Sequence, residues 1–244
     1  MMSAILPAAV LAVLVRLALR HDTRQETTWV FTAGLTALVA GCVLGTEYVG
    51  DHGIDVAASD LFGENISDLL RSVYLVAGCA CIGLIALHGI YGEWAPDSLT
   101  NYRRRWLITC GVAGIILIVT SRAGLALTVP VSDELELLDV ASGIYSATFY
   151  VIVAATAALV ATASVLTVRL DGWRLVPVAT GLVGMLGASS AVVTLLLLLA
   201  HREWLAANHA VVATGWALPL VGILAAAGLW GIIRAAIKER AQRA

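Results

Sequence analysis

Seven long runs of apolar residues alternate with short polar stretches along the chain. The runs cover about residues 3–20, 28–47, 69–91, 106–127, 139–168, 175–200 and 208–233. Each run reaches or nearly reaches the roughly 20 residues that an α-helix needs to cross a hydrocarbon layer about 30 Å thick. No polar stretch between them is long enough to fold alone. The pattern therefore predicts an all-α fold, a single polytopic membrane domain over residues 1–244 built as a bundle of seven transmembrane helices.

The composition agrees with this prediction. Hydrophobic residues make up 60% of the chain and charged residues 13%, whereas a soluble domain has about 45–50% and about 25%. These fractions exclude a water-soluble protein. The formal net charge of -2, with no basic face, excludes nucleic-acid binding. The expected location is the cell (cytoplasmic) membrane, with membrane lipid as a partner.

Positively charged residues predict the orientation of the bundle. Twelve of the fifteen Lys and Arg residues fall in alternate connections and in the C-terminal tail. Because these residues accumulate on the cytoplasmic side, we expect the N-terminus outside and the C-terminus in the cytoplasm. No Lys or Arg precedes the first run, so we expect a retained helix and not a cleaved signal peptide. Five tryptophans fall at the predicted inner boundary, as in an aromatic belt: Trp29, Trp94, Trp106, Trp173 and Trp230.

Ionisable residues are missing from the middle of every run. This argues against a pump or a carrier that is coupled to ions through intramembrane carboxylates. No run has an interior lysine that could hold retinal as a Schiff base. The histidines and cysteines show no close spacing typical of metal ligands, so we expect no metal and no cofactor. The four cysteines are expected to serve as small packing residues: Cys42, Cys79, Cys81 and Cys110.

Charged residues gather instead at the predicted outer boundary. Glu47 ends the second run, Arg71 begins the third, Arg122 lies near the end of the fourth and Asp139 opens the fifth. Charges at this depth need partners, and we expect Arg122 to pair with Asp139, with Glu47 as the other candidate. Aromatic side chains are predicted just below this rim: Tyr74, Tyr145, Phe149 and Trp216.

The outer residues have two interpretations, which the sequence leaves open. The charged rim over an aromatic floor is typical of a small-molecule pocket, and the same residues also suit paired salt bridges and ordinary helix packing. Eleven of the seventeen acidic residues lie on the outer side. They keep outer loops solvated, or they form a vestibule that attracts cations.

Small residues predict close helix contacts. Gly41-x-x-x-Gly45 lies in the second run, and Gly181, Gly184 and Gly187 lie in the sixth. Glycines allow helix backbones to approach closely in lipid. We expect contacts within the chain, with a homodimer seam as the alternative.

Three polar segments resemble those of a family of actinobacterial seven-span proteins classed as transporters. They are Arg20-His-Asp-Thr-Arg24, Glu64-Asn-Ile-Ser-Asp-Leu-Leu70 and Arg103-Arg-Arg105. Longer members of that family continue into a cytoplasmic domain of unknown function. The general plan is also similar to the seven-span sensor modules of some bacterial histidine kinases. The resemblance implies a protein that binds or transports a small molecule.

An enzyme is the alternative. Integral membrane terpene cyclases are similar in length and helix number, and they use acidic residues as proton donors. Under this resemblance, Glu47, Glu64 or Asp139 would act as general acid on an isoprenoid-like substrate. The Trp-Glu pair typical of an early span in those cyclases is missing here, and Thr46-Glu47 is the nearest match.

Overall fold

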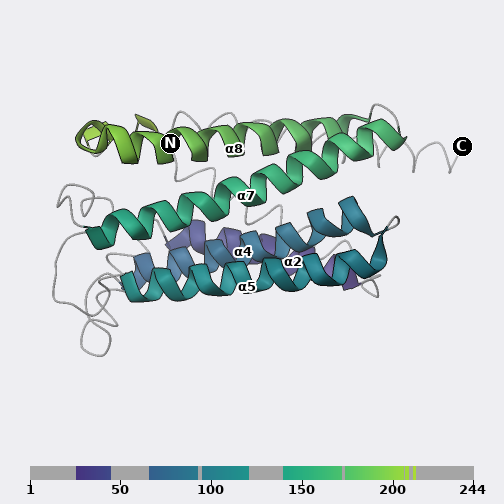
Figure 1. Ribbon diagram of the computed structural model, residues 1–244, viewed down its shortest axis with the longest axis horizontal. Coiled ribbons are helices and arrows are strands. Elements are labelled where there is room, and N and C mark those ends of the chain that lie inside the picture. Colours follow the sequence, from purple (N-terminus) through teal and green to yellow (C-terminus); the bar gives the residue numbers. More distant parts are fainter. Residues whose placement is uncertain are drawn as a thin grey trace, which may run out of the picture.

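The described part of the chain consists of helices and the short turns between them. The computed structural model describes residues 26–44, 66–92, 95–120, 140–171, 174–205, 207–208 and 211–212. Five long helices lie roughly along one axis (Figure 1). They are α2 (Glu26–Leu44), α4 (Ile66–Tyr91), α5 (Pro96–Thr120), α7 (Val140–Asp171) and α8 (Leu175–Ala200). No strand occurs in these ranges, so the predicted all-α class is confirmed for them.

Three of these helices are long and apolar enough to cross a membrane. Their apolar segments are Leu69–Tyr91 in α4, Gly143–Leu170 in α7 and Leu175–Ala200 in α8. They match the third, fifth and sixth predicted runs, so membrane-spanning character is supported there. The apolar segment found in α2, Thr32–Gly41, is shorter. The first predicted run and nearly all of the seventh lie outside the described residues.

Helix α5 begins ten residues before the predicted start of the fourth run. Pro96 occupies its first position, where a missing N–H costs little, and Asp97 follows in the first turn, where a negative charge is favourable. Arg103, Arg104 and Arg105 therefore lie within the helix, two turns from its start. The prediction placed this boundary too late because hydropathy marks the apolar part of a helix and not its polar beginning.

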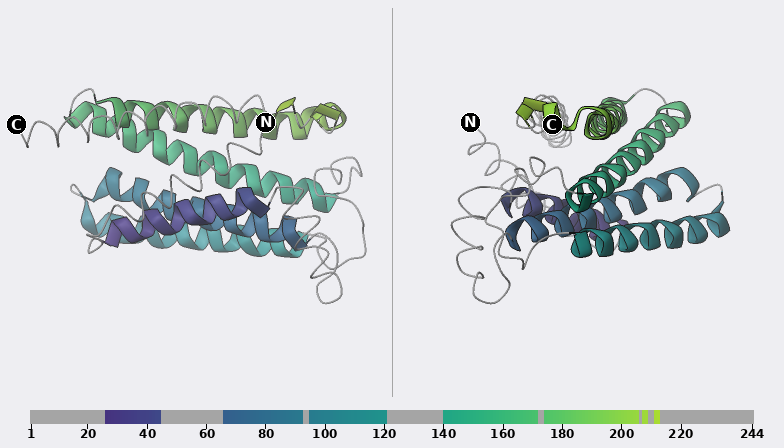
Figure 2. Two further views of the ribbon diagram at one scale, coloured as in Figure 1. Left: turned by 180° about the vertical axis from the view of Figure 1, so that it is seen from behind. Right: turned by 60° about the vertical axis from the view of Figure 1, so that its left-hand side comes forward.

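Helix α4 is central to one half of the bundle, since it packs against α2, α5 and α7. Helix α7 also contacts α5 and α8. Figures 1 and 2 show α7 running obliquely between α8 and the group of α2, α4 and α5. At about 1.5 Å per residue, the 32 residues of α7 span about 48 Å, which exceeds the thickness of a bilayer core. The fifth predicted run, residues 139–168, is likewise longer than the roughly 20 residues that a simple span requires.

Helices α4 and α7 run in the same direction. Ser72 hydrogen-bonds to Tyr145 near the start of both helices, and an added Cβ at Gly89 would lie 3.7 Å from the Ala163 Cβ near their ends. Between α4, α5 and α7 lies the main apolar core, which includes Leu117, whose side chain is fully buried. We call the end where α4 and α7 begin the Arg71 end, and the end where they finish the Arg103 end.

Glycines allow close backbone contacts within the chain. Gly41 of α2 lies against Leu75 of α4. Gly184 of α8 lies against the backbone of Ala157 and Ala161 of α7. Both glycines therefore serve the intramolecular packing that the sequence predicted. Gly45 lies outside the described residues.

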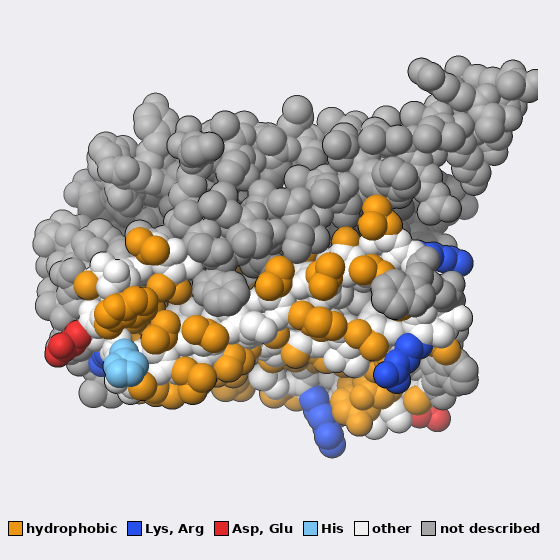
Figure 3. Space-filling view, turned by 90° about the horizontal axis from the view of Figure 1, so that it is seen from above, with side chains coloured by type: hydrophobic (Ala, Val, Ile, Leu, Met, Phe, Trp, Pro, Cys, Tyr) orange, Lys and Arg blue, Asp and Glu red, His pale blue; other side chains and the backbone are white. Residues whose placement is uncertain are grey.

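The outward surface of the helices is strongly apolar. Ile115 and Val119 on α5 are 62% and 76% exposed, and Leu199 on α8 is 73% exposed. Figure 3 shows hydrophobic side chains distributed along the whole described part of one face, with most of the charged side chains toward the two ends. A continuous apolar exterior is unfavourable in water. This surface supports a membrane-embedded protein.

Candidate functional site

The Arg71 end of α4 and α7 brings together five of the side chains that bear on the predicted pocket. Their common position follows from the parallel direction of the two helices. We call this group the Arg71 cluster: Arg71 and Ser72 of α4, and Tyr145, Phe149 and Tyr150 of α7. Three of its members, Arg71, Tyr145 and Phe149, were predicted from the sequence.

The inner half of the cluster is buried. The Ser72 and Tyr145 hydroxyls share a hydrogen bond, and the two side chains are 7% and 5% exposed. Tyr145 is also part of the apolar core. A hydroxyl pair of this kind satisfies two polar groups that lipid would leave without partners. Tyr145 therefore fixes α7 against α4, and its partner Ser72 carries no signal in the sequence pattern that would mark it as a site residue.

In the outer half of the cluster Arg71 is exposed, whereas Phe149 and Tyr150 are half-buried. The charge of Arg71 acts electrostatically on the Tyr150 phenol of the neighbouring helix. The rings of Phe149 and Tyr150 meet edge to face, with centroids 5.6 Å apart and an interplanar angle of 72°. Phe149 also packs against the core. The arrangement places a cation and a pair of aromatic rings at the same end of the apolar segments.

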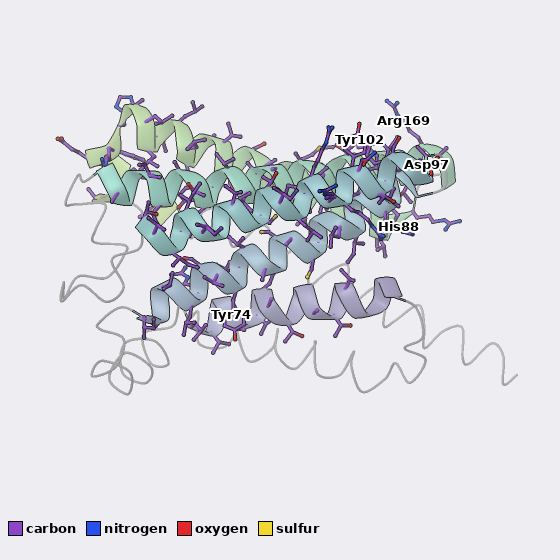
Figure 4. The ribbon with its side chains drawn as sticks, turned by 60° about the horizontal axis from the view of Figure 1, so that its bottom comes forward. Tyr74, His88, Asp97, Tyr102 and Arg169 are labelled. Carbon is purple, nitrogen blue, oxygen red and sulfur yellow. The ribbon has the colours of Figure 1, made fainter. Side chains whose placement is uncertain are left out.

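Tyr74 lies away from the buried Ser72–Tyr145 pair of this group, although it is only about 60° around α4 from Arg71. Two residues along α4 correspond to about 200° around the helix, so Tyr74 lies on nearly the opposite side from Ser72. Its side chain is 42% exposed. Figure 4 shows it in the part of α4 remote from His88 and Tyr102. The structure thus separates Tyr74 from Tyr145, although the two residues have similar predicted depths.

Five of the predicted site residues lie outside the described residues. The expected ion pair between Arg122 and Asp139 falls there, and so do the other members: Glu47, Glu64 and Trp216. The carboxylates that a cyclase would use are therefore not part of the described site.

The described cysteines behave as packing residues. Cys79 and Cys110 are buried, Cys81 is half-buried, and all three are free thiols. The Cys79 thiol hydrogen-bonds to Thr156 of α7, and the Thr156 hydroxyl donates to the Ile152 carbonyl at 2.8 Å. In the part of the chain that the structure describes, no three His, Cys, Asp or Glu side chains are placed to hold a metal ion.

Trp106 has a different role from the predicted one. It is only 9% exposed and belongs to the core. Its indole Nε1 donates a hydrogen bond to the Ala80 carbonyl of α4, at 3.1 Å. The prediction of a tryptophan at the lipid interface is therefore wrong for Trp106. Its ring is enclosed because it follows Leu99 by seven residues on the buried face of α5.

Comparisons of the chain with protein families, with curated proteins and with solved structures gave no match.

Proposed function

We propose that this protein is a multi-pass protein of the cytoplasmic membrane that binds a small amphipathic molecule at the Arg71 end, as a sensor or transporter does. The anionic or hydrogen-bond-accepting group of the ligand pairs with Arg71, and its apolar part lies against Phe149 and Tyr150. The resemblance to the seven-span transporter family supports the same class of function. In the proposed orientation this end faces outward.

One observation carries the proposal. Arg71 is an exposed cation on an otherwise apolar segment, at the same end as the paired rings of Phe149 and Tyr150 on the adjacent helix. A guanidinium next to aromatic surfaces can bind an acceptor group and an apolar group of one ligand at the same time. This combination distinguishes the Arg71 end from the rest of the described apolar helix surface.

The proposed binding is independent of ion coupling. The three apolar segments of α4, α7 and α8 contain no Asp, Glu or Lys. Carboxylates inside the membrane are the usual groups that couple transport to protons or sodium. If the protein moves its ligand, we expect uptake into liposomes to be unchanged when the proton and sodium gradients are collapsed.

We expect Arg71→Gln to weaken the binding of an anionic amphiphile about tenfold, because a charge-assisted hydrogen bond is lost (about 1.4 kcal/mol). The probes are octanoate, octanol and octylamine, which share an apolar chain and differ in the charge of the polar group. Binding is measured by titration calorimetry of the protein in lipid nanodiscs, with empty nanodiscs as the blank. Wild type should prefer octanoate, and Arg71→Lys should keep part of that preference.

The matched control is Arg174→Gln, which removes an exposed arginine at the opposite end of the bundle. It should bind octanoate as wild type does. Equal octanoate binding by wild type and Arg71→Gln would contradict the proposed site. A wild-type preference for octylamine would instead favour the cation-attracting vestibule.

A further inference from the structure

One arginine lies on the packing face of α5. Positions on the buried face of this helix recur at helical spacing: Leu99, Arg103, Trp106, Cys110, Ala113 and Leu117. Arg103 is the one charged residue among them. Its side chain is half-buried, and its Nε atom is buried with no hydrogen-bond partner in the described part of the chain. A strong donor therefore lies on a helix face whose other positions carry mostly apolar side chains.

Arg103 lies at the level where the apolar segments end. The ring of Tyr102, the preceding residue, stacks on Tyr91 at the end of α4, with centroids 4.6 Å apart and an interplanar angle of 12°. The apolar segment of α7 ends at Leu170, next to Arg169. Figure 4 shows Tyr102 and Arg169 at the same end of the bundle. In a bilayer this level coincides with the lipid headgroups.

The described carboxylate of α5 does not neutralise Arg103. Asp97 lies six residues earlier, which corresponds to about 240° around the helix, and its side chain is exposed. A partly buried guanidinium without an acceptor is unfavourable. Exposed apolar side chains follow one turn farther along the helix, where Leu107 is 49% and Ile108 is 55% exposed. The position thus combines an unused donor, a second arginine at the same end and an apolar surface below.

We propose that Arg103 binds the phosphate of an anionic membrane lipid, with Arg169 supplying a second positive charge. The planar guanidinium fork matches the geometry of phosphate oxygens, and the donors for the phosphate are its terminal N–H groups, because Nε is buried. The acyl chains lie along Leu107, which is exposed and lies about 40° around the helix from Arg103. Because the site combines phosphate recognition with an apolar surface, its occupant is a lipid and not a free phosphate. This site is separate from the Arg71 cluster, which lies at the other end of α4.

The test compares dioleoylphosphatidylglycerol with dioleoylphosphatidylcholine, added to the full chain in neutral detergent. We expect phosphatidylglycerol to raise the thermal unfolding midpoint of wild type by about 5 °C relative to phosphatidylcholine. Arg103→Gln should lose most of this difference, and Arg103→Lys should keep part of it. Arg105→Gln is the matched control, because Arg105 is exposed and lies about 200° around the same helix. It should retain most of the difference.

Two results would overturn the proposal. One is an equal phosphatidylglycerol effect in wild type and Arg103→Gln. The other is the same stabilisation of wild type by inorganic phosphate without lipid, which would indicate a free-phosphate site. If Arg103→Gln does not fold, native mass spectrometry of wild type and Arg103→Lys decides. Wild type should retain more phosphatidylglycerol than phosphatidylcholine and more than the lysine variant, and equal retention would refute the site.

Discussion

Replacement of Gly184 by alanine is expected to destabilise the packing of α8 on α7 by about 1–3 kcal/mol. A Cβ at this position would lie 2.7 Å from the Ala161 nitrogen and 2.8 Å from the Ala157 carbonyl oxygen. Both atoms belong to the backbone of α7 and cannot move aside as a flexible side chain can. The added methyl group must therefore push the two helices apart along their contact.

The measurement is unfolding in mixed micelles with increasing sodium dodecyl sulfate. The control is Gly111→Ala on α5, where an added Cβ would meet nothing within 4 Å. Alanine favours the helix over glycine by about 1 kcal/mol, so this variant should be as stable as wild type or slightly more stable. Equal destabilisation of the two variants would show that α7 and α8 are not in close backbone contact at Gly184.

Gly83→Ala is expected to disrupt the core between α4 and α5. Its Cβ would lie 2.3 Å from the Trp106 Nε1 atom and 2.4 Å from Cε2. The indole must move, and its hydrogen bond to the Ala80 carbonyl breaks. Overpacking and the lost hydrogen bond together predict a destabilisation of about 2–4 kcal/mol.

A second substitution separates this clash from a general effect of alanine at position 83. In Trp106→Leu the indole is absent, so Gly83→Ala in that background should have almost no further effect. The same detergent-induced unfolding gives the four free energies of this double-mutant cycle. Additive effects of the two substitutions would contradict the observed contact between Gly83 and Trp106.

Helix α8 was predicted correctly at both ends because several features agree there. Its apolar run is continuous, Pro177 lies in its first turn, and the polar residues Arg174 and His201 flank it. The start of α5 was missed because the first turns of this helix are mostly polar. They include Ser98, Thr100 and Asn101. The burial of Trp106 could have been predicted from its spacing to Leu99 and Cys110, whereas its position at the edge of an apolar run favoured the lipid interface.

The candidate site could be predicted only in part. Up-and-down order places the start of α4 and the start of α7 at the same end, so topology implies that Arg71 and Phe149 lie toward the same end of the bundle. The hydrogen bond between Ser72 and Tyr145 depends on how each helix is rotated about its own axis. Continuous apolar runs do not determine that rotation. The same rotation turns Tyr74 away from Ser72.

The central claim is that α8 crosses the membrane with its C-terminal end outside, so that the Arg71 end faces outward. Its 26 residues span about 39 Å, enough to cross a bilayer core.

The most direct measurement is labelling with a membrane-impermeant maleimide in right-side-out vesicles. Single cysteines replace Arg174 or Glu203 in a chain whose four native cysteines are changed to alanine, and both positions are exposed. We expect Glu203→Cys to react at once and Arg174→Cys only after the vesicles are permeabilised. Immediate reaction of both would show that α8 does not cross the membrane, and the reverse pattern would place the Arg71 end in the cytoplasm.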